Sequence, residues 1–146
     1  MPINVHSNHW VLAVINFMAR RFEYFDSLRR ANGSVLYYLR KWLRDERAAA
    51  RVRRGEAAVN DDAWLEEWGD KEWGDADGVP KQRNGYDCAV FMCTTARYLA
   101  ASARLDFGQE HMDYFRQRMV YELMIKALLP HAEEAEQFEA LAAAAR

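Results

Sequence analysis

The chain has 146 residues, with 22 acidic and 20 basic side chains and a net charge of −2 at pH 7. This length suits one domain with a real core, and the balanced charge gives no support to binding of nucleic acid or another polyanion. Two cysteines are too few for a disulfide framework and favour a reducing compartment. No apolar run reaches the ~18 residues of a membrane span, and the N-terminus has no signal-peptide profile, so we expect a soluble intracellular protein without a membrane partner.

Residues 1–28 are expected to form β structure. Residues 10–17 are almost continuously apolar and rich in branched side chains, which is typical of a strand covered on both faces, and residues 22–25 return as a second, antiparallel strand. His9 lies just before the first strand and Asp26 just after the second, on the same side of this hairpin. A turn centred near residues 17 and 18 would bring them abreast, whereas a polar tip at residues 20 and 21 would shift the register, so the pattern permits the contact without fixing it.

A helix is predicted to follow, with Ser34 as its N-cap and an apolar stripe formed by Val35, Leu36, Leu39, Trp42 and Leu43. Residues 40–54 carry seven Lys or Arg. They form either an anion-binding patch or a solvated face helped by cations near a helix C-terminus, and we favour the solvated face.

Residues 56–78 have the opposite character, with nine acidic residues and a single lysine. They also carry Trp64, Trp68 and Trp73. We interpret this segment as a partly extended surface connection whose tryptophans pack back onto the core, with partner binding as the alternative.

A loop-to-helix transition lies at residues 79–93. Asn84-Gly85 is a turn signal, and apolar residues then recur at helical spacing, with Cys88 in the first turn and Asp87 as the expected N-cap. Free backbone N–H groups and the helix dipole at such a position stabilise a thiolate, the nucleophilic form of cysteine. The competing interpretation, a small buried hydrophobe, is assigned to Cys93.

The last predicted helix spans residues 109–129 and ends at Pro130. Its core stripe is formed by Met112, Phe115, Met119, Leu123 and Ala127. Residues 131–146 are expected to be a peripheral Ala/Glu-rich tail.

Four of these residues together match the needs of a thiol protease. Such an enzyme requires a nucleophile, a base, a group that orients the base and donors for the oxyanion. Cys88, His9 and Asp26 suit the first three roles. Gln82, on the loop before the cysteine, can direct its amide N–H at the oxyanion beside the Cys88 backbone N–H.

The segments His9-Trp10, Phe25-Asp26-Ser27-Leu28 and Gln82-Arg-Asn-Gly-Tyr-Asp-Cys88 resemble the ubiquitin-like-protein-specific (Ulp/sentrin-specific) cysteine proteases that process SUMO. The order His, Asp, Gln, Cys is that of this family. The resemblance covers roughly residues 1–129 and implies an α+β, papain-like (adenain/Ulp-type) fold in which helices pack a mixed sheet.

By this resemblance, His9 is the general base, Asp26 its orienting carboxylate, Cys88 the nucleophile and Gln82 the oxyanion donor. Trp10 resembles one wall of the narrow tunnel through which the family threads a diglycine C-terminus. The resemblance further implies a ubiquitin-like modifier and its conjugates as partners, no cofactor or metal, a monomer, and a nuclear or cytoplasmic location with the nucleus favoured.

Two departures from the family pattern stand out. Ala89 replaces the glycine that usually follows the nucleophile. The chain also starts at a sequence that lies well inside the family's catalytic domain, so we expect residues 1–146 to form one partial domain whose N-terminal part is missing.

Three functional hypotheses remain open. The first is a cysteine protease that cleaves after the diglycine of SUMO, ubiquitin or another ubiquitin-like modifier. The second is an inactive remnant that binds a modifier or another protein. The third is a zinc site formed by His6, His9, Cys88 and Cys93, which the spacing of the two cysteines within one helix suits poorly.

Overall fold

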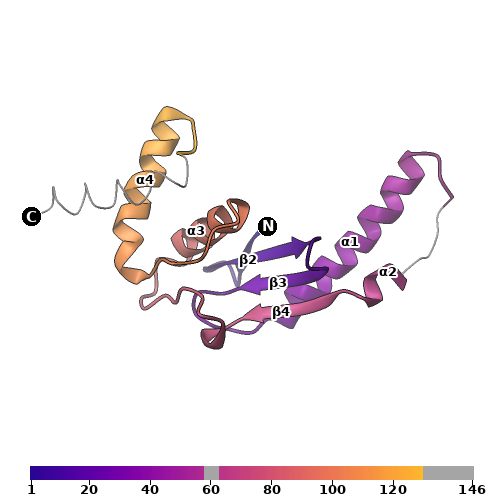
Figure 1. The fold of residues 1–146 in the computed structure, drawn as a ribbon, viewed down its shortest axis with the longest axis horizontal. Helices are drawn as coiled ribbons and strands as arrows, with labels where there is room; N and C mark the ends of the chain where they lie inside the picture. The colour runs from indigo at the N-terminus through magenta and orange to yellow at the C-terminus, as the bar shows by residue number, and fades with distance from the viewer. Residues whose placement is uncertain (58–62, 130–146) are drawn as a thin grey trace, which may run out of the picture.

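The structure is a computed structural model that describes residues 1–57 and 63–129, so the predicted tail at residues 131–146 lies outside the described residues. A four-stranded sheet, in the order β1-β2-β3-β4, lies at its centre (Figure 1). The elements are β1 (Pro2–Val5), β2 (His9–Asn16), β3 (Arg21–Phe25), α1 (Gly33–Arg53), α2 (Ala63–Glu66), β4 (Gly69–Trp73), the 3-10 turn η1 (Asp75–Asp77), α3 (Cys88–Ala100), the 3-10 turn η2 (Gln109–His111) and α4 (Met112–Ile125).

The predicted hairpin is confirmed as the antiparallel pair β2–β3. Its register places Leu12 opposite Phe25 and Asn16 opposite Arg21. The centre of the turn therefore lies one residue later in the chain than it would if His9 were directly opposite Asp26. His9 is also the first residue of β2 and pairs with Val5 of β1, which corrects the prediction that it precedes the strand.

The mixed character of the sheet comes from β4, which the sequence did not predict as a strand. It pairs in parallel with β3, from Arg21 opposite Gly69 to Phe25 opposite Trp73. Its sequence, Gly-Asp-Lys-Glu-Trp, lacks the branched residues that mark strands, and it occupies an edge of the sheet where charged side chains remain in water.

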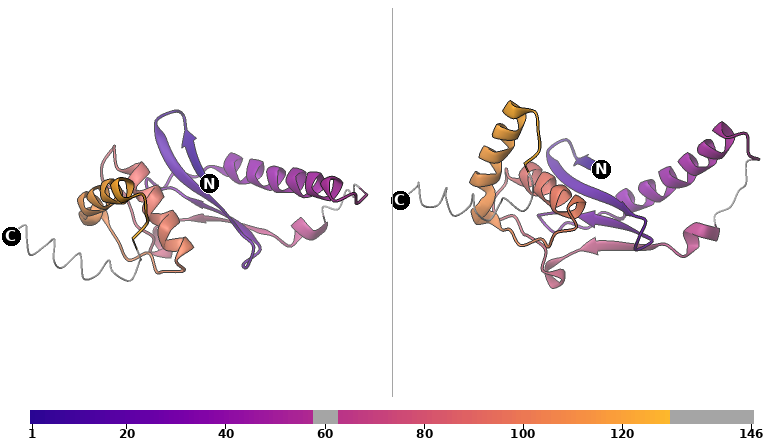
Figure 2. Two further views of the ribbon diagram at one scale, coloured as in Figure 1. Left: turned by 90° about the horizontal axis from the view of Figure 1, so that it is seen from above. Right: turned by 45° about the horizontal axis from the view of Figure 1, so that its top comes forward.

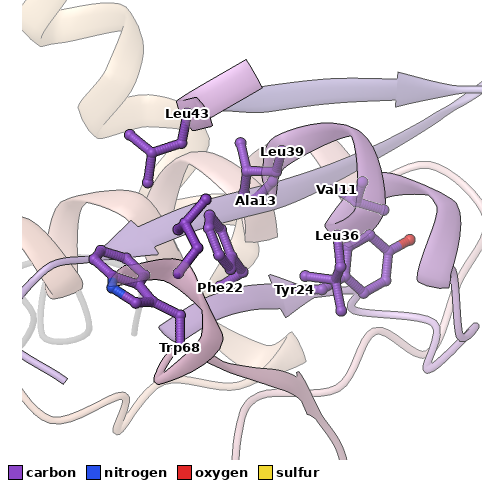
Figure 3. Packing of buried hydrophobic residues seen from close by; sticks show 9 residues of the cluster. Val11, Ala13, Phe22, Tyr24, Leu36, Leu39, Leu43 and Trp68 are labelled. Atoms are coloured by element: carbon purple, nitrogen blue, oxygen red, sulfur yellow. The ribbon is translucent and has the colours of Figure 1, made fainter. Parts of the chain in front are cut away.

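Helix α1 covers one face of the sheet and extends beyond its end (Figure 1). Leucines from α1 pack on the side chains of β2 and β3, and Trp68 closes the cluster (Figure 3). The buried members are Val11, Ala13, Phe22, Tyr24, Leu36, Leu39, Leu43, Leu65 and Trp68.

Two details of α1 differ from the prediction. The helix begins at Gly33 with Asn32 at the N-cap position and without a side-chain cap, so Ser34 lies inside the helix. Trp42, predicted to lie in the apolar stripe, is 48% exposed. Only the leucines of the stripe face the sheet closely enough to be buried.

The basic end of α1 faces the acidic segment that follows it. Arg40 bonds to Asp70 at 2.7 Å and to the backbone oxygens of Leu65 and Trp68, each at 2.9 Å. Arg47 lies over the ring of Trp64. These contacts favour the solvated, internally paired face over an anion-binding patch.

Helices α3 and α4 lie together near the end of the sheet where β2 begins, away from the far end of α1 (Figures 1 and 2). The predicted inner side of α3 is confirmed, because Val90, Phe91, Thr94 and Tyr98 are all buried. Val90, Phe91 and Tyr98 form a second buried cluster with Phe107, Met112 and Phe115. Helix α3 also packs against β2, where Val11, Leu12 and Ala13 are buried in succession. Strand β2 is therefore covered on both faces at its middle, while Val14 and Ile15 are only half-buried.

Helix α4 is shorter than predicted. The α-helix ends at Ile125, and Lys126 adopts a left-handed conformation with φ 55° that stops it before Ala127. Met112 and Phe115 are buried as expected, but Leu123 is 78% exposed, so the predicted stripe is wrong at its C-terminal end. No helix in the described ranges, 1–57 and 63–129, is long and apolar enough to cross a membrane.

Two tryptophans offer a matched test of this packing. Trp68 is buried, with ring centroids 5.3–5.5 Å from Phe17, Phe22 and Trp64, whereas about half of Trp42 is exposed to water. We expect Trp68→Ala to lower the free energy of unfolding by about 3–5 kcal/mol. Trp42→Ala should cost less than about 1 kcal/mol. Urea unfolding of both variants measures the difference, and equal losses would contradict the assignment of Trp68 to the core.

Candidate active site

His9 and Asp26 form a buried pair at the start of β2 and the end of β3. His9 Nε2 lies 2.7 Å from Asp26 Oδ1, and both residues are almost fully buried. Because Leu12 pairs with Phe25, Asp26 follows opposite Val11, two residues from His9 on the same face of the hairpin. Such diagonal neighbours lie within reach of long side chains. The contact that the sequence permitted is thus made.

Backbone groups hold the Asp26 carboxylate in place. Oδ1 also accepts the N–H of Leu28 at 2.7 Å, and Oδ2 accepts the N–H of Arg30 at 3.2 Å. An ionised carboxylate only accepts hydrogen bonds, so His9 carries its proton on Nε2 and keeps Nδ1 as the acceptor when the ring is neutral.

Tyr24 lies near this carboxylate but does not compete as a base. Burial raises the pKa of Tyr24 to about 12, and the charges of Asp26 and Glu72 add to the effect. Its phenol therefore stays protonated near neutral pH.

Cys88 is the first residue of α3 and is buried. The first N–H groups of an α-helix have no intrahelical acceptor, so the N-terminus of α3 presents donors beside the thiol. Helix α3 packs against β2, which begins with His9. No hydrogen bond joins the Cys88 thiol to the His9 ring among the residues that the structure describes. Bonds between catalytic groups often shorten only when substrate is bound.

Gln82 lies on the loop before α3 and is tied to the segment that follows Asp26. Its backbone N–H donates to the Ser27 carbonyl at 2.9 Å, and its Oε1 accepts from Ser27 Oγ at 2.8 Å. Its Nε2 donates to the Asn84 carbonyl at 2.6 Å, with a longer contact of 3.3 Å to Asn84 Oδ1. The predicted oxyanion donor is therefore fixed near the Asp26 segment, with its amide directed at Asn84.

Asp87 occupies the predicted N-cap position, but its side chain does not cap α3. Its carboxylate instead accepts hydrogen bonds from Asn84 Nδ2 and Gln109 Nε2, each at 2.6 Å, and from the Arg116 guanidinium. Burial alone would raise the pKa of Asp87, but these hydrogen bonds and the charge of Arg116 outweigh it, so the pKa lies below its usual range. Asp87 thus links the loop before Cys88 to η2 and α4.

Cys93 is exposed, which corrects the prediction that it is a buried hydrophobe. Five residues rotate about 140° around an α-helix, so Cys93 faces away from Cys88. It lines a groove between α3 and α4, where partial desolvation raises the pKa of its thiol. The two cysteines therefore occupy different surroundings.

Trp10 is 37% exposed and lines a narrow hollow beside the candidate site. Asp26, Ser27, Arg29 and Pro80 also line this hollow. Ala89, on the first turn of α3, is half-buried.

The zinc hypothesis finds no matching cluster. Within residues 1–57 and 63–129, no group of three or more His, Cys, Asp or Glu side chains is arranged to hold a metal ion. His6 lies in the exposed β1–β2 turn, and His9 Nε2 is bonded to Asp26.

The sequence did not single out four residues that hold this site together, Ser27, Arg29, Gln109 and Arg116. Gln109 bridges the Arg83 N–H and the Asp87 carboxylate, at 2.8 and 2.6 Å. The seven-residue spacing of Gln109 and Arg116 matches one helix face and was an available signal. Arg29 carried no such signal, because a loop arginine is usually solvated.

The chain matches a known protein family along most of its described length. The C-terminal catalytic domain of the Ulp1 protease family matches residues 1–128. A Caenorhabditis elegans protein named Sentrin-specific protease is 34% identical over 122 residues, which are 83% of this chain and 16% of that protein. The Arabidopsis thaliana Ubiquitin-like-specific protease ESD4 is 35% identical over 116 residues, 80% of this chain and 22% of that protein. The chain thus spans about a fifth of the length of these relatives.

Solved structures of similar proteins share the fold. The C-terminal Ulp1 protease domain in complex with Smt3, the yeast orthologue of SUMO, matches with a TM-score of 0.56 and 26% identity, covering 80% of this chain and 47% of that one. The catalytic domain of the Chaetomium thermophilum Ulp1-like SUMO protease matches with a TM-score of 0.66 and 26% identity, covering 88% and 46%. The α+β, Ulp-type fold is therefore confirmed, and the chain belongs to the Ulp1 protease family.

Proposed function

We propose that the chain is a cysteine peptidase and isopeptidase that cleaves after the C-terminal diglycine of a ubiquitin-like modifier, with SUMO as the favoured modifier. The observation that carries the proposal is the buried His9–Asp26 hydrogen bond of 2.7 Å, made from the strand against which the helix that begins with Cys88 packs. Family membership supports it, because the relatives are named as sentrin-specific and ubiquitin-like-specific proteases. The nuclear location stays a prediction from the same family.

In the proposed reaction, His9 Nδ1 accepts the Cys88 proton and the sulfur attacks the carbonyl carbon of the terminal glycine. The resulting imidazolium is stabilised by Asp26, whose carboxylate is held by the Leu28 and Arg30 N–H groups. His9 then protonates the amine as the C–N bond breaks, which leaves a thioester on Cys88. Water, deprotonated by His9, attacks the thioester and releases the modifier carboxylate and the Cys88 thiol.

The developing oxyanion needs donors next to Cys88. The Cys88 backbone N–H supplies one, and Gln82 Nε2 supplies a second once it gives up its longer contact of 3.3 Å to Asn84 Oδ1. The shorter bond to the Asn84 carbonyl then continues to orient the amide. Trp10 would contact the diglycine, whose lack of side chains lets it pass beside a flat aromatic wall.

The alternative is a binding module without activity. The buried His9–Asp26 pair argues against it, since a binding surface has no need of an oriented imidazole. A chain that binds a modifier but hydrolyses none would favour this alternative.

The first test of the function identifies the nucleophile. A ubiquitin-like modifier that carries an electrophile at its C-terminus should form a covalent adduct with Cys88, mapped by mass spectrometry. Probes built on SUMO and on ubiquitin compare the modifiers directly. Cys88→Ala should abolish the adduct, whereas Cys93→Ala, the matched control, should form it at an unchanged rate because Cys93 faces another groove. Adduct formation at Cys93 would remove Cys88 from the mechanism.

The second test concerns Asp26. In Asp26→Asn the amide can donate to His9 Nε2, which places the ring proton on Nδ1 and removes the base. We expect turnover of a modifier–fluorophore substrate to fall by about 10²- to 10⁴-fold.

The control for Asp26→Asn is Glu23→Gln, the same chemical change on β3. Glu23 is equally buried but bonds to Asn16, Arg21 and Trp73. Glu23→Gln should lower the free energy of unfolding but should change the turnover per folded molecule little. Equal losses of turnover in the two variants would show that Asp26 has only a structural role.

A further inference from the structure

Arg29 occupies an unusual position next to the candidate site, in the lining of the hollow beside Trp10. It follows Asp26 by three residues and adopts a left-handed backbone conformation, with φ 63°, which is uncommon for a residue other than glycine. Its backbone N–H donates to the Asp26 carbonyl at 3.0 Å and closes a turn. Its side chain is only 13% exposed, so the guanidinium lies against the protein and not in water.

The guanidinium joins three separate segments. Nη1 donates to the Asp26 carbonyl at 3.1 Å, and Nη2 donates to the Pro80 carbonyl at 3.0 Å and to the Val79 carbonyl. Nε donates to Asp75 Oδ1 at 2.9 Å. One planar group with five donors in fixed directions makes all these contacts, which a lysine ammonium on a flexible stem cannot reproduce.

The segments that Arg29 joins are those that present the orienting carboxylate and the oxyanion donor. Asp26 bonds to His9, and Pro80 lies two residues before Gln82. Residues 79–87 contain no helix or strand, so side-chain contacts must fix their position. The Ser27–Gln82 bonds make a second connection between the same two segments.

The geometry points to Arg29 as a positioning residue that sets the distance between the Asp26–His9 pair and the Gln82–Cys88 loop. This inference rests on the proposed function, because it deepens the account of the same site. Loss of the guanidinium would leave Val79 and Pro80 without their partner and let the loop shift relative to Asp26. Displacements of about 1 Å at reacting groups can lower turnover by about 100-fold.

The test compares Arg29→Asn with Arg30→Asn in the full chain. Asparagine tolerates the left-handed backbone, so Arg29→Asn removes the side-chain contacts without adding backbone strain. Arg30 is the neighbouring exposed arginine, and its replacement makes the same change of charge. Arg29→Lys keeps the positive charge that Arg29→Asn removes, but it lacks the planar set of guanidinium donors.

The first readout is amide hydrogen exchange, which needs no substrate. The Gln82 N–H, bonded to Ser27, and the Leu28 N–H, bonded to Asp26, should exchange about 10-fold faster or more in Arg29→Asn than in Arg30→Asn. Amides of β2 should be unchanged in both variants, which excludes global unfolding. Equal exchange at the Gln82 and Leu28 amides in the two variants would overturn the inference.

The second readout is turnover of a modifier–fluorophore substrate. Arg29→Asn should lower kcat by about 10- to 100-fold with KM changed less than about twofold, and Arg29→Lys should recover only a small part of the loss. A kcat equal to that of Arg30→Asn would overturn the inference. If the unsubstituted chain hydrolyses no modifier substrate, the proposed function fails, and the exchange comparison alone decides whether Arg29 fixes the loop.

Discussion

The pairing of β2 with β3 is the constraint on which the rest of the structure depends. Side chains alternate between the two faces of a strand, so a shift by one residue would send His9 to the face opposite Asp26. A shift by two residues keeps both on one face and only makes the contact diagonal, as observed with Leu12 opposite Phe25. Helix α1 packs on β2 and β3, and α3 packs on β2, so both layers are positioned by the same hairpin.

The nucleophile depends on contacts that the hairpin alone does not supply. Residues 79–87 have no ladder of backbone hydrogen bonds, and polar side chains take its place. Asp87 is buried with Asn84, Gln109 and Arg116 as donors, and a hydrogen bond to a charged group contributes about 1.5–3 kcal/mol. Removing one donor would leave a buried carboxylate short of partners, which costs more than the bond itself contributes.

The sequence predicted the parts of the fold that local patterns determine. The hairpin, the inner side of α3 and the position of Cys88 at its start follow from a continuous apolar run, helical spacing and turn signals. Edge strand β4 could not be predicted, because four of its five residues are polar or glycine and the segment becomes a strand only when β3 offers its free edge. The spacing of Gln109 and Arg116 suits one helix face, but it did not identify Asp87 as their shared partner, since an N-cap and a tertiary network use the same residue type at the same position.

The predicted exposure of single side chains failed for a related reason. A periodic pattern gives the direction in which a side chain points on its helix but not the extent of the neighbouring element. Trp42 and Leu123 fit their stripes, yet no neighbouring element covers them, although Leu43 and Glu122 beside them are buried. Cys93 lines the groove between α3 and α4, where no side chain of either helix covers it fully.

Ion pairs and hydrogen bonds to backbone carbonyls both hold the segment that leads to Gln82, and salt affects them differently. Asp75 pairs with Lys81 and with Arg29 at the surface, where the two cations lower the pKa of Asp75 and where salt screens the attraction. The guanidinium of Arg29 also reaches the backbone carbonyls of Asp26 and Pro80, which are uncharged and shielded from ions. Ionic strength therefore weakens the outer pairs while the carbonyl contacts persist. The distance between the Asp26 segment and the loop before Cys88 thus depends on contacts that salt reaches least.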